Sequence, residues 1–198
     1  KGQKLAALFF DRDGVIVEEV NYLHRVEDLR LIPGAAAAIS RANARSIPVV
    51  MVTNQSGVGR GYYDWPAFAK LQEELLLRLG REDAEVNMVM ACGYHKDALS
   101  AYQIENHPWR KPNPGMLNAA ANDLGLDLSR SWLIGDALSD IDAARNAGLA
   151  GAVHVLTGHG ARDRAVALTR KAPRFSVRPL DSVLGISALI DELFPVRR

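Results

Sequence analysis

Short apolar segments alternate with helix-forming segments along most of this sequence, and this alternation constrains the fold more than any other feature. The apolar segments suit strands that are buried on both faces, and the connections between elements are short. Right-handed βαβ units in one sheet satisfy this pattern. We therefore expect an α/β fold, a Rossmann-like doubly wound parallel sheet without a large cap domain. The expected strands are residues 5–10, 47–52, 86–91, 131–135, 152–156 and 175–177, and the expected helices are about 35–43, 65–79, 114–124, 140–147 and 181–194.

Length and hydrophobic content suit a single folded unit. The chain has 198 residues, of which 48% are hydrophobic, so it can bury a full core as one domain. We expect this domain to span residues 1–198, with a small flap at about 18–33 and a long loop at about 92–113. Core elements occupy the remaining residues, so neither segment has room for a large cap.

The balanced charge argues against nucleic-acid and membrane partners, and the single cysteine argues against a disulfide. Lys and Arg number 24 against 23 Asp and Glu, a net charge of +1, so nothing draws the chain to nucleic acid or to an acidic membrane surface. The single cysteine, Cys92, rules out an internal disulfide and suits a reducing compartment. No signal peptide is evident, and no apolar run approaches the ~20 residues of a membrane span. We expect a cytoplasmic protein, a monomer or weak oligomer, and the first residue, Lys1, suggests that a native start is missing.

Two carboxylates follow the first expected strand. Asp11 and Asp13 are two residues apart, so their side chains point the same way in extended backbone, and Gly14 then allows a sharp turn. Carboxylates held this close repel each other, and either a cation or a retained proton must relieve the repulsion. Both outcomes suit a site that handles phosphate. Taken alone, the pattern also fits a solvated, Asp-rich turn.

Two further strands end in polar side chains. Thr53 follows the second strand and Asp136 follows the fourth. Because open α/β sheets bind ligands at the carboxyl ends of their strands, we expect Asp11, Thr53 and Asp136 to line one edge. Individually, each residue has an ordinary alternative, such as a turn or the start of a helix.

Four motifs in order resemble those of the haloacid dehalogenase (HAD) superfamily. They are Asp11-x-Asp13-Gly14, Thr53, Lys111 and Gly135-Asp136-x-x-x-Asp140. The longer strings at 52–57 and 110–117 resemble the branch that holds the heptose bisphosphate phosphatases and the histidinol-phosphate phosphatases. The resemblance covers about residues 5–157.

This resemblance implies a phosphoryl-transfer site. Asp11 would be the nucleophile that forms an aspartyl-phosphate, and Asp13 the general acid and base. Thr53 and Lys111 would bind phosphoryl oxygens. A Mg²⁺ ion would be bound by Asp11, Asp13 (through its backbone carbonyl) and Asp136. Asp140 would support Lys111 or a metal-bound water.

A second group of side chains is expected to select the substrate. Asn54, Gln55, Arg60 and Arg110 provide donors for a remote phosphate or sugar hydroxyl. The extra cations favour a sugar bisphosphate, such as D-glycero-D-manno-heptose 1,7-bisphosphate, over histidinol phosphate. Exposed arginines in loops are also often only solvated.

Two other interpretations compete with a phosphatase. A receiver-like switch also carries Asp, Thr and Lys at the ends of parallel strands, although its phosphorylated Asp ends a middle strand of the sequence. The glycines at 57–61 suggest a dinucleotide site, but their spacing is G-x-G-x-G rather than G-x-G-x-x-G.

The long loop raises the question of zinc. The resembled branch often carries a site of the form C-x-H then C-x-C there, but in this sequence only the first cysteine, Cys92, is present. Cys92, His95 and His107 are three candidate ligands, whereas a structural zinc normally takes four. We favour the alternative that aromatic packing orders the loop without metal. The aromatic residues concerned are Tyr94, Tyr102 and Trp109.

Overall fold

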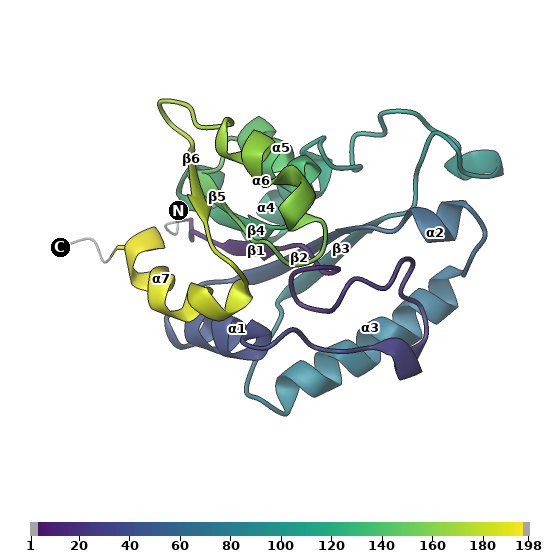
Figure 1. Ribbon diagram of the computed structural model, residues 1–198, viewed down its shortest axis with the longest axis horizontal. Helices are drawn as coiled ribbons and strands as arrows, with labels where there is room; N and C mark the ends of the chain where they lie inside the picture. The colour runs from purple at the N-terminus through teal and green to yellow at the C-terminus, as the bar shows by residue number, and fades with distance from the viewer. Residues whose placement is uncertain (1–3, 196–198) are drawn as a thin grey trace.

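A six-stranded sheet, parallel throughout, forms the centre of the computed structural model, which describes residues 4–195 (Figure 1). The spatial order of its strands is β3-β2-β1-β4-β5-β6. This is the doubly wound order of Rossmann folds, so the predicted fold class is confirmed. The strands are β1 (Leu8–Phe10), β2 (Val49–Asn54), β3 (Met88–Cys92), β4 (Trp132–Gly135), β5 (Gly151–His154) and β6 (Ser176–Pro179).

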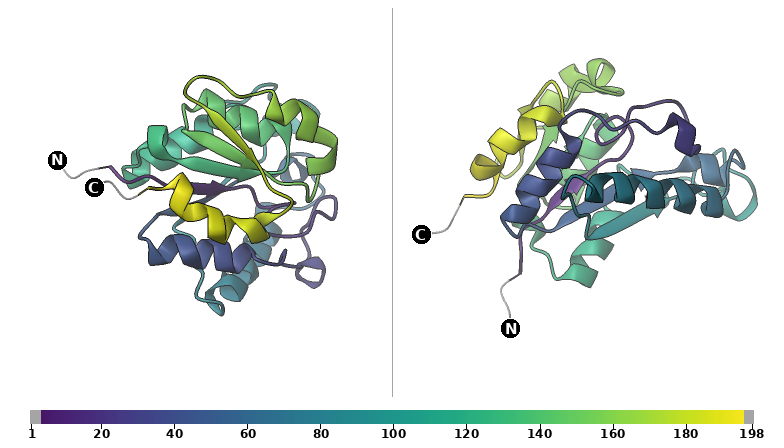
Figure 2. Two further views of the ribbon diagram at one scale, coloured as in Figure 1. Left: turned by 60° about the vertical axis from the view of Figure 1, so that its left-hand side comes forward. Right: turned by 90° about the horizontal axis from the view of Figure 1, so that it is seen from below.

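Helices cover both faces of the sheet (Figure 1). The α-helices are α1 (Ala35–Ala44), α2 (Ser56–Gly59), α3 (Trp65–Gly80), α4 (Gly115–Leu124), α5 (Leu138–Asn146), α6 (Gly160–Leu168) and α7 (Ile186–Leu193). Short 3₁₀ helices are η1 (Val26–Asp28), η2 (Ser100–Tyr102), η3 (Leu128–Arg130) and η4 (Val183–Gly185). Helices α1, α3 and α7 lie on one face and α4, α5 and α6 on the other, and the left view of Figure 2 shows α7 alongside α1.

Alternation along the strands divides the core in two. In β1, Leu8 and Phe10 pack with the layer of α1, α3 and α7, whereas Phe9 packs with α4 and α5 on the opposite face. All three side chains are fully buried. Both faces of β1 are therefore apolar, which explains its uninterrupted hydrophobic run.

The structure differs from the expected elements in two helices. The segment 56–59 forms the short helix α2 where loop was expected, and α6 was not expected at all. Helix α6 buries only Gly160 and Ala167, so it has no apolar stripe for a sequence pattern to reveal. By contrast, α3 begins as predicted, because the Asp64 side chain accepts a hydrogen bond from the Ala67 N–H at 2.9 Å.

From β1 the chain adds β2 and β3 on one side of the sheet, and it then adds β4, β5 and β6 on the other side. The order of the strands therefore switches between β1 and β4. This switch point is where doubly wound folds bind ligands, just beyond the carboxyl ends of the strands. Two loops lie at this edge, the flap at about 18–33, which contains η1, and the loop at about 92–113, which contains η2. The ends of the expected domain, residues 1 and 198, lie outside the described residues, which are 4–195. None of the described helices combines the length and apolar character needed to span a bilayer.

Candidate active site

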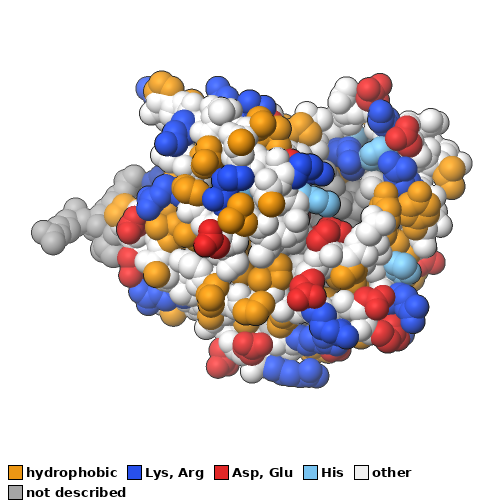
Figure 3. Space-filling view, viewed as in Figure 1, with side chains coloured by type: hydrophobic (Ala, Val, Ile, Leu, Met, Phe, Trp, Pro, Cys, Tyr) orange, Lys and Arg blue, Asp and Glu red, His pale blue; other side chains and the backbone are white. Residues whose placement is uncertain are grey.

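The charged motifs of the sequence meet at the carboxyl edge of the sheet. Asp11 follows β1, Asp136 follows β4, and Lys111 arrives from the loop before α4. All three line a cleft of about 320 Å³, and charged and histidine side chains surround the hollow in Figure 3.

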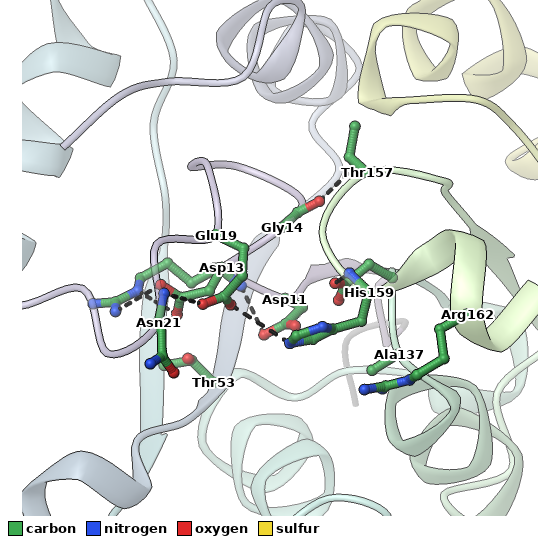
Figure 4. Close-up of polar contacts among 12 residues, drawn as sticks. Asp11, Asp13, Gly14, Glu19, Asn21, Thr53, Ala137, Thr157, His159 and Arg162 are labelled. Carbon is green, nitrogen blue, oxygen red and sulfur yellow. Dashed lines mark hydrogen bonds and ion pairs between the residues drawn. The ribbon is translucent and has the colours of Figure 1, made fainter. Parts of the chain in front are cut away.

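Figure 4 shows Asp11 and Asp13 between Asn21 on one side and His159 on the other. Thr53, one residue before the end of β2, is buried and is not among the residues that line the cleft.

Lys111 is held by three oxygens from three parts of the fold. Its Nζ donates to Asp140 Oδ1 at 2.6 Å, to the Val52 carbonyl at 2.9 Å and to Asp11 Oδ1 at 3.0 Å. Burial alone would lower the pKa of Lys111, but the Asp11 and Asp140 carboxylates outweigh it and raise that pKa. The ammonium is therefore a fixed positive charge beside Asp11.

The backbone of Lys111 is fixed as well. The Asn54 side chain accepts a hydrogen bond from the Lys111 N–H and donates one to the Lys111 carbonyl, each at 3.1 Å. Asn54 was expected to bind substrate. It does line the cleft, but these two bonds make it a support for the lysine.

Asp11, Asp136 and Asp140 form a compact group of carboxylates. One oxygen from each lies within 4.8 Å of the others. Burial, followed by repulsion from Asp140, raises the pKa of Asp11 well above its ordinary value, and the same two causes raise the pKa of Asp136 to about 7. Lys111 supplies one positive charge against three carboxylates, so this donor set suits a hard divalent cation.

Asp13 is held by side chains on both sides of it. Arg12 donates to both carboxylate oxygens, and Gln55 Nε2 donates to Oδ2 at 3.1 Å. The same Gln55 nitrogen donates to Thr53 Oγ1 at 2.8 Å, while the Tyr63 hydroxyl donates to Gln55 Oε1. Gln55 thus connects two of the residues that sequence analysis assigned to catalysis.

Comparison with known proteins decides the family. Residues 108–182 match the family model described as HAD-hydrolase-like. A D-glycero-β-D-manno-heptose-1,7-bisphosphate 7-phosphatase from Mesorhizobium japonicum is 48% identical over 146 residues, which are 74% of this chain and 67% of the relative. The D-glycero-D-manno-heptose-1,7-bisphosphate 7-phosphatase of Thermosynechococcus vestitus is 44% identical over 160 residues, covering 79% of this chain and 81% of the relative. This chain belongs to the heptose bisphosphate phosphatase family of HAD-like hydrolases.

A solved member of this phosphatase family has the same fold. The D,D-heptose 1,7-bisphosphate phosphatase from B. bronchiseptica, complexed with magnesium and phosphate, superimposes with a TM-score of 0.80 at 26% identity and covers 96% of this chain and 99% of the other. The predicted superfamily and phosphatase class are thus confirmed. The receiver-like alternative is not supported, because receivers have the strand order 2-1-3-4-5.

The two arginines expected to bind substrate have different surroundings. Arg110 lines the phosphatase cleft and donates to the Tyr94 carbonyl at 3.3 Å. Arg60 does not line the cleft; its guanidinium lies 3.5 Å from Asp97 and 3.2 Å from His95 Nδ1. Two side chains of the long loop, Asp97 and His95, therefore contact Arg60, and its expected role in substrate binding stays a prediction.

Cys92, His95 and His107 are not brought together as metal ligands within the described part of this phosphatase. His95 Nδ1 accepts a hydrogen bond from the Asp97 N–H, and His107 Nδ1 accepts one from the Trp109 N–H, each at 3.0 Å. The His107 ring stacks on Tyr94 at 3.8 Å between centroids, and Tyr94 also packs against Tyr102. The expected aromatic packing thus includes His107 on Tyr94, whereas Trp109 is 37% exposed.

Several residues that line the cleft of this phosphatase were missed in the sequence. His159 and Glu19 approach each other to 3.9 Å from the loop after β5 and from the flap, and Figure 4 shows Arg162 beyond His159. A polar segment directly after an apolar strand was the signal for His159. Arg12 was missed because a charged residue between two aspartates is typical of a solvent-exposed turn, whereas its side chain is buried. The missed residues are Arg12, Glu19, Asn21, Tyr22, Leu23, Ser56, Tyr63, Ala137, Ser139, His159 and Arg162.

Proposed function

We propose that this protein is a Mg²⁺-dependent phosphatase that removes the 7-phosphate of D-glycero-D-manno-heptose 1,7-bisphosphate through a covalent intermediate on Asp11. One observation carries the proposal, namely the contact of 3.0 Å between Asp11 Oδ1 and Lys111 Nζ at the switch point of the sheet. The named activity of relatives at up to 48% identity supports the substrate.

The donor set supports magnesium. The carboxylates of Asp11 and Asp136, together with the Asp13 backbone carbonyl, are the proposed ligands, and all are the oxygen donors that Mg²⁺ prefers. The raised pKa values of Asp11 and Asp136 reflect burial and carboxylate repulsion, which a divalent cation would relieve. When bound, the ion supplies neutralisation of phosphoryl charge.

Asp11 carries the covalent chemistry in this proposal. The Arg12 N–H, at 2.8 Å, and Lys111 Nζ hold the carboxylate through Oδ1 and so fix its orientation. A carboxylate oxygen attacks phosphorus, an acyl phosphate bond forms and the bond to the sugar oxygen breaks. Lys111 neutralises charge on the phosphoryl oxygens, and Thr53 with its neighbouring backbone amide binds the others.

Asp13 moves the protons. It gives a proton to the departing sugar oxygen, which leaves as an alcohol. The resulting Asp13 carboxylate then takes a proton from water, and the water oxygen attacks the phosphorus of the acyl phosphate. Orthophosphate leaves, the Asp11 carboxylate returns, and Asp13 is protonated again for the next cycle.

Arg110 is the proposed contact for the second phosphate. Its guanidinium lines the same cleft as Asp11 and Lys111, and planar N–H donors match phosphate oxygens well. Histidinol phosphate offers no second anion for it and is the alternative substrate. We also propose that the protein acts in the cytoplasm, since its one cysteine suits a reducing compartment, and that it acts as a monomer or weak oligomer.

Phosphate release from a substrate panel tests this function. The panel contains both anomers of the heptose 1,7-bisphosphate, histidinol phosphate and nucleotides, each with Mg²⁺ or with a chelator. We expect many turnovers, the highest kcat/KM with a heptose bisphosphate, and no activity with the chelator. Preference for histidinol phosphate would overturn the substrate, and release of a single equivalent would overturn the enzyme.

A further inference from the structure

A buried histidine contacts the backbone of Asp136 from behind the cleft. His154 is the last residue of β5, lies opposite Gly135 of β4 in the sheet register and is fully buried. Its Nε2 lies 2.8 Å from the Asp136 carbonyl oxygen. Because a carbonyl oxygen only accepts hydrogen bonds, Nε2 must carry the proton and donate.

Arg164 on α6 fixes the other nitrogen of this ring. Its Nε lies 2.9 Å from His154 Nδ1. A guanidinium only donates, so Nδ1 must be the unprotonated acceptor, and the ring is held as the neutral Nε2–H tautomer. Arg164 Nη2 also donates to the carbonyls of His154, at 3.1 Å, and of Leu180. The arginine is therefore held in place by β5 and by Leu180, the residue after β6.

The Asp136 side chain is fixed from the same segment of chain. The His159 N–H, just before α6, donates to Asp136 Oδ2 at 2.6 Å. Gly14 and Gly158 pack so closely that a Cβ on either would lie 2.4 Å or 2.1 Å from that oxygen. The residues from β5 to α6 thus hold Asp136 by both its backbone and its carboxylate, which leaves it little freedom to turn.

We propose that His154 and Arg164 form a positioning pair that orients Asp136 for divalent-cation binding. This inference rests on the proposed function, in which Asp136 is a metal ligand. Residues that hydrogen-bond behind a metal ligand fix its orientation, and their loss commonly lowers metal affinity by about 10- to 100-fold. His154 and Arg164 are positioning residues rather than catalytic ones, because they act through Asp136 and do not line the cleft.

Calorimetric titration of the metal-free protein with Mg²⁺ tests the pair. We expect His154→Met to bind Mg²⁺ about 10- to 100-fold more weakly. His154→Gln should stay close to wild type, since its amide N–H can replace the Nε2 donor, and Arg164→Met should lie between the two. Arg170→Met is the matched control, because Arg170 lies just after α6 but pairs with Asp142 at 2.7 Å and not with His154. Its Mg²⁺ affinity should equal that of the wild type.

Activity at increasing Mg²⁺ separates positioning from general damage. In the His154→Met variant, kcat should return towards the wild-type value at saturating Mg²⁺. Wild-type Mg²⁺ affinity in both His154→Met and Arg164→Met, or a kcat that saturating Mg²⁺ does not restore, would overturn the inference. If His154→Met fails to fold, the Mg²⁺ affinities of the other two variants decide the inference. Arg164→Met should bind Mg²⁺ more weakly than the wild type, and His154→Gln should bind it about as well. Absence of Mg²⁺ binding in the wild type would instead overturn the proposed function.

Discussion

Arg12 forms a two-pronged ion pair with its neighbour in the chain, Asp13. Its Nε lies 2.9 Å from Asp13 Oδ2 and its Nη2 lies 3.0 Å from Oδ1. The arginine is 1% exposed, and its Cζ lies 5.4 Å from the centre of the Phe68 ring. A buried guanidinium in this geometry fixes the plane of the Asp13 carboxylate, so the proposed acid and base does not rotate freely.

Loss of this ion pair should impair proton transfer most where the leaving group is poor. We expect Arg12→Met to lower kcat for the heptose bisphosphate by about 10²-fold, the lower end of what general acid–base catalysis contributes. An activated aryl phosphate needs little protonation and should lose clearly less. Arg12→Lys is the control that keeps the charge. Equal losses with both substrates would contradict a role through Asp13.

Asp11→Asn should abolish turnover and keep the fold. The amide has the shape of the carboxylate but cannot act as the nucleophile, and Lys111 retains its 2.6 Å bond to Asp140. Phosphate release and circular dichroism measure the two effects. Asp13→Asn should instead accumulate phosphoenzyme with activated substrates. More than a few per cent of residual activity in Asp11→Asn would disprove its role.

Stability of the metal-free protein should fall as pH rises from about 4 to about 7. Burial and the Asp140 charge raise the pKa of Asp136 from 3.8 to about 7 on folding. Between these values the folded state binds more protons than the unfolded state, so ionisation on raising the pH removes stability. We expect Asp136→Asn to reduce this slope and Mg²⁺ to raise the Tm more at pH 8 than at pH 5. An unchanged slope in Asp136→Asn, measured by calorimetry, would show that other groups are responsible.

Arg110→Ala should discriminate between bisphosphate and monophosphate substrates. A charged hydrogen bond to phosphate contributes about 1 to 3 kcal/mol, so kcat/KM for the heptose bisphosphate should fall by that amount. A monophosphate should lose less. Arg60→Ala is the comparison, and we expect a smaller effect because Arg60 pairs with Asp97 and His95. Equal losses for both substrates would remove Arg110 from recognition of the second phosphate.

Elemental analysis should find less than one zinc per chain. The His107 ring stacks on Tyr94, and the Nδ1 atoms of His95 and His107 already accept backbone hydrogen bonds. Cys92→Ser should leave the metal content and the melting temperature of the protein nearly unchanged. One tightly bound zinc per chain that disappears in Cys92→Ser would show that the loop is a metal site.

The sheet and the position of the site were predictable because they depend on local patterns. Apolar runs identified the strands, and Asp11 and Asp136 follow two of these runs at the same edge. The contacts of Arg60 with His95 and Asp97 could not be predicted, because these partners belong to a loop whose path depends on distant packing. Helix α6 and His154 escaped notice since neither lies in an amphipathic pattern, and a buried histidine in a short strand reads as ordinary core.

The three oxygens around Lys111 have a consequence for how the enzyme assembles. They come from the segment after β1, from β2 and from α5. The ammonium therefore connects the portion of chain that contains β1 and β2 to the portion that contains β4 and α5, and these portions lie on opposite sides of the switch point. A partly folded chain that had formed only one portion would lack some of the oxygens that hold the Lys111 ammonium. Recovery of activity after dilution from denaturant should therefore report the docking of the two portions, and should follow the recovery of helical circular dichroism rather than coincide with it.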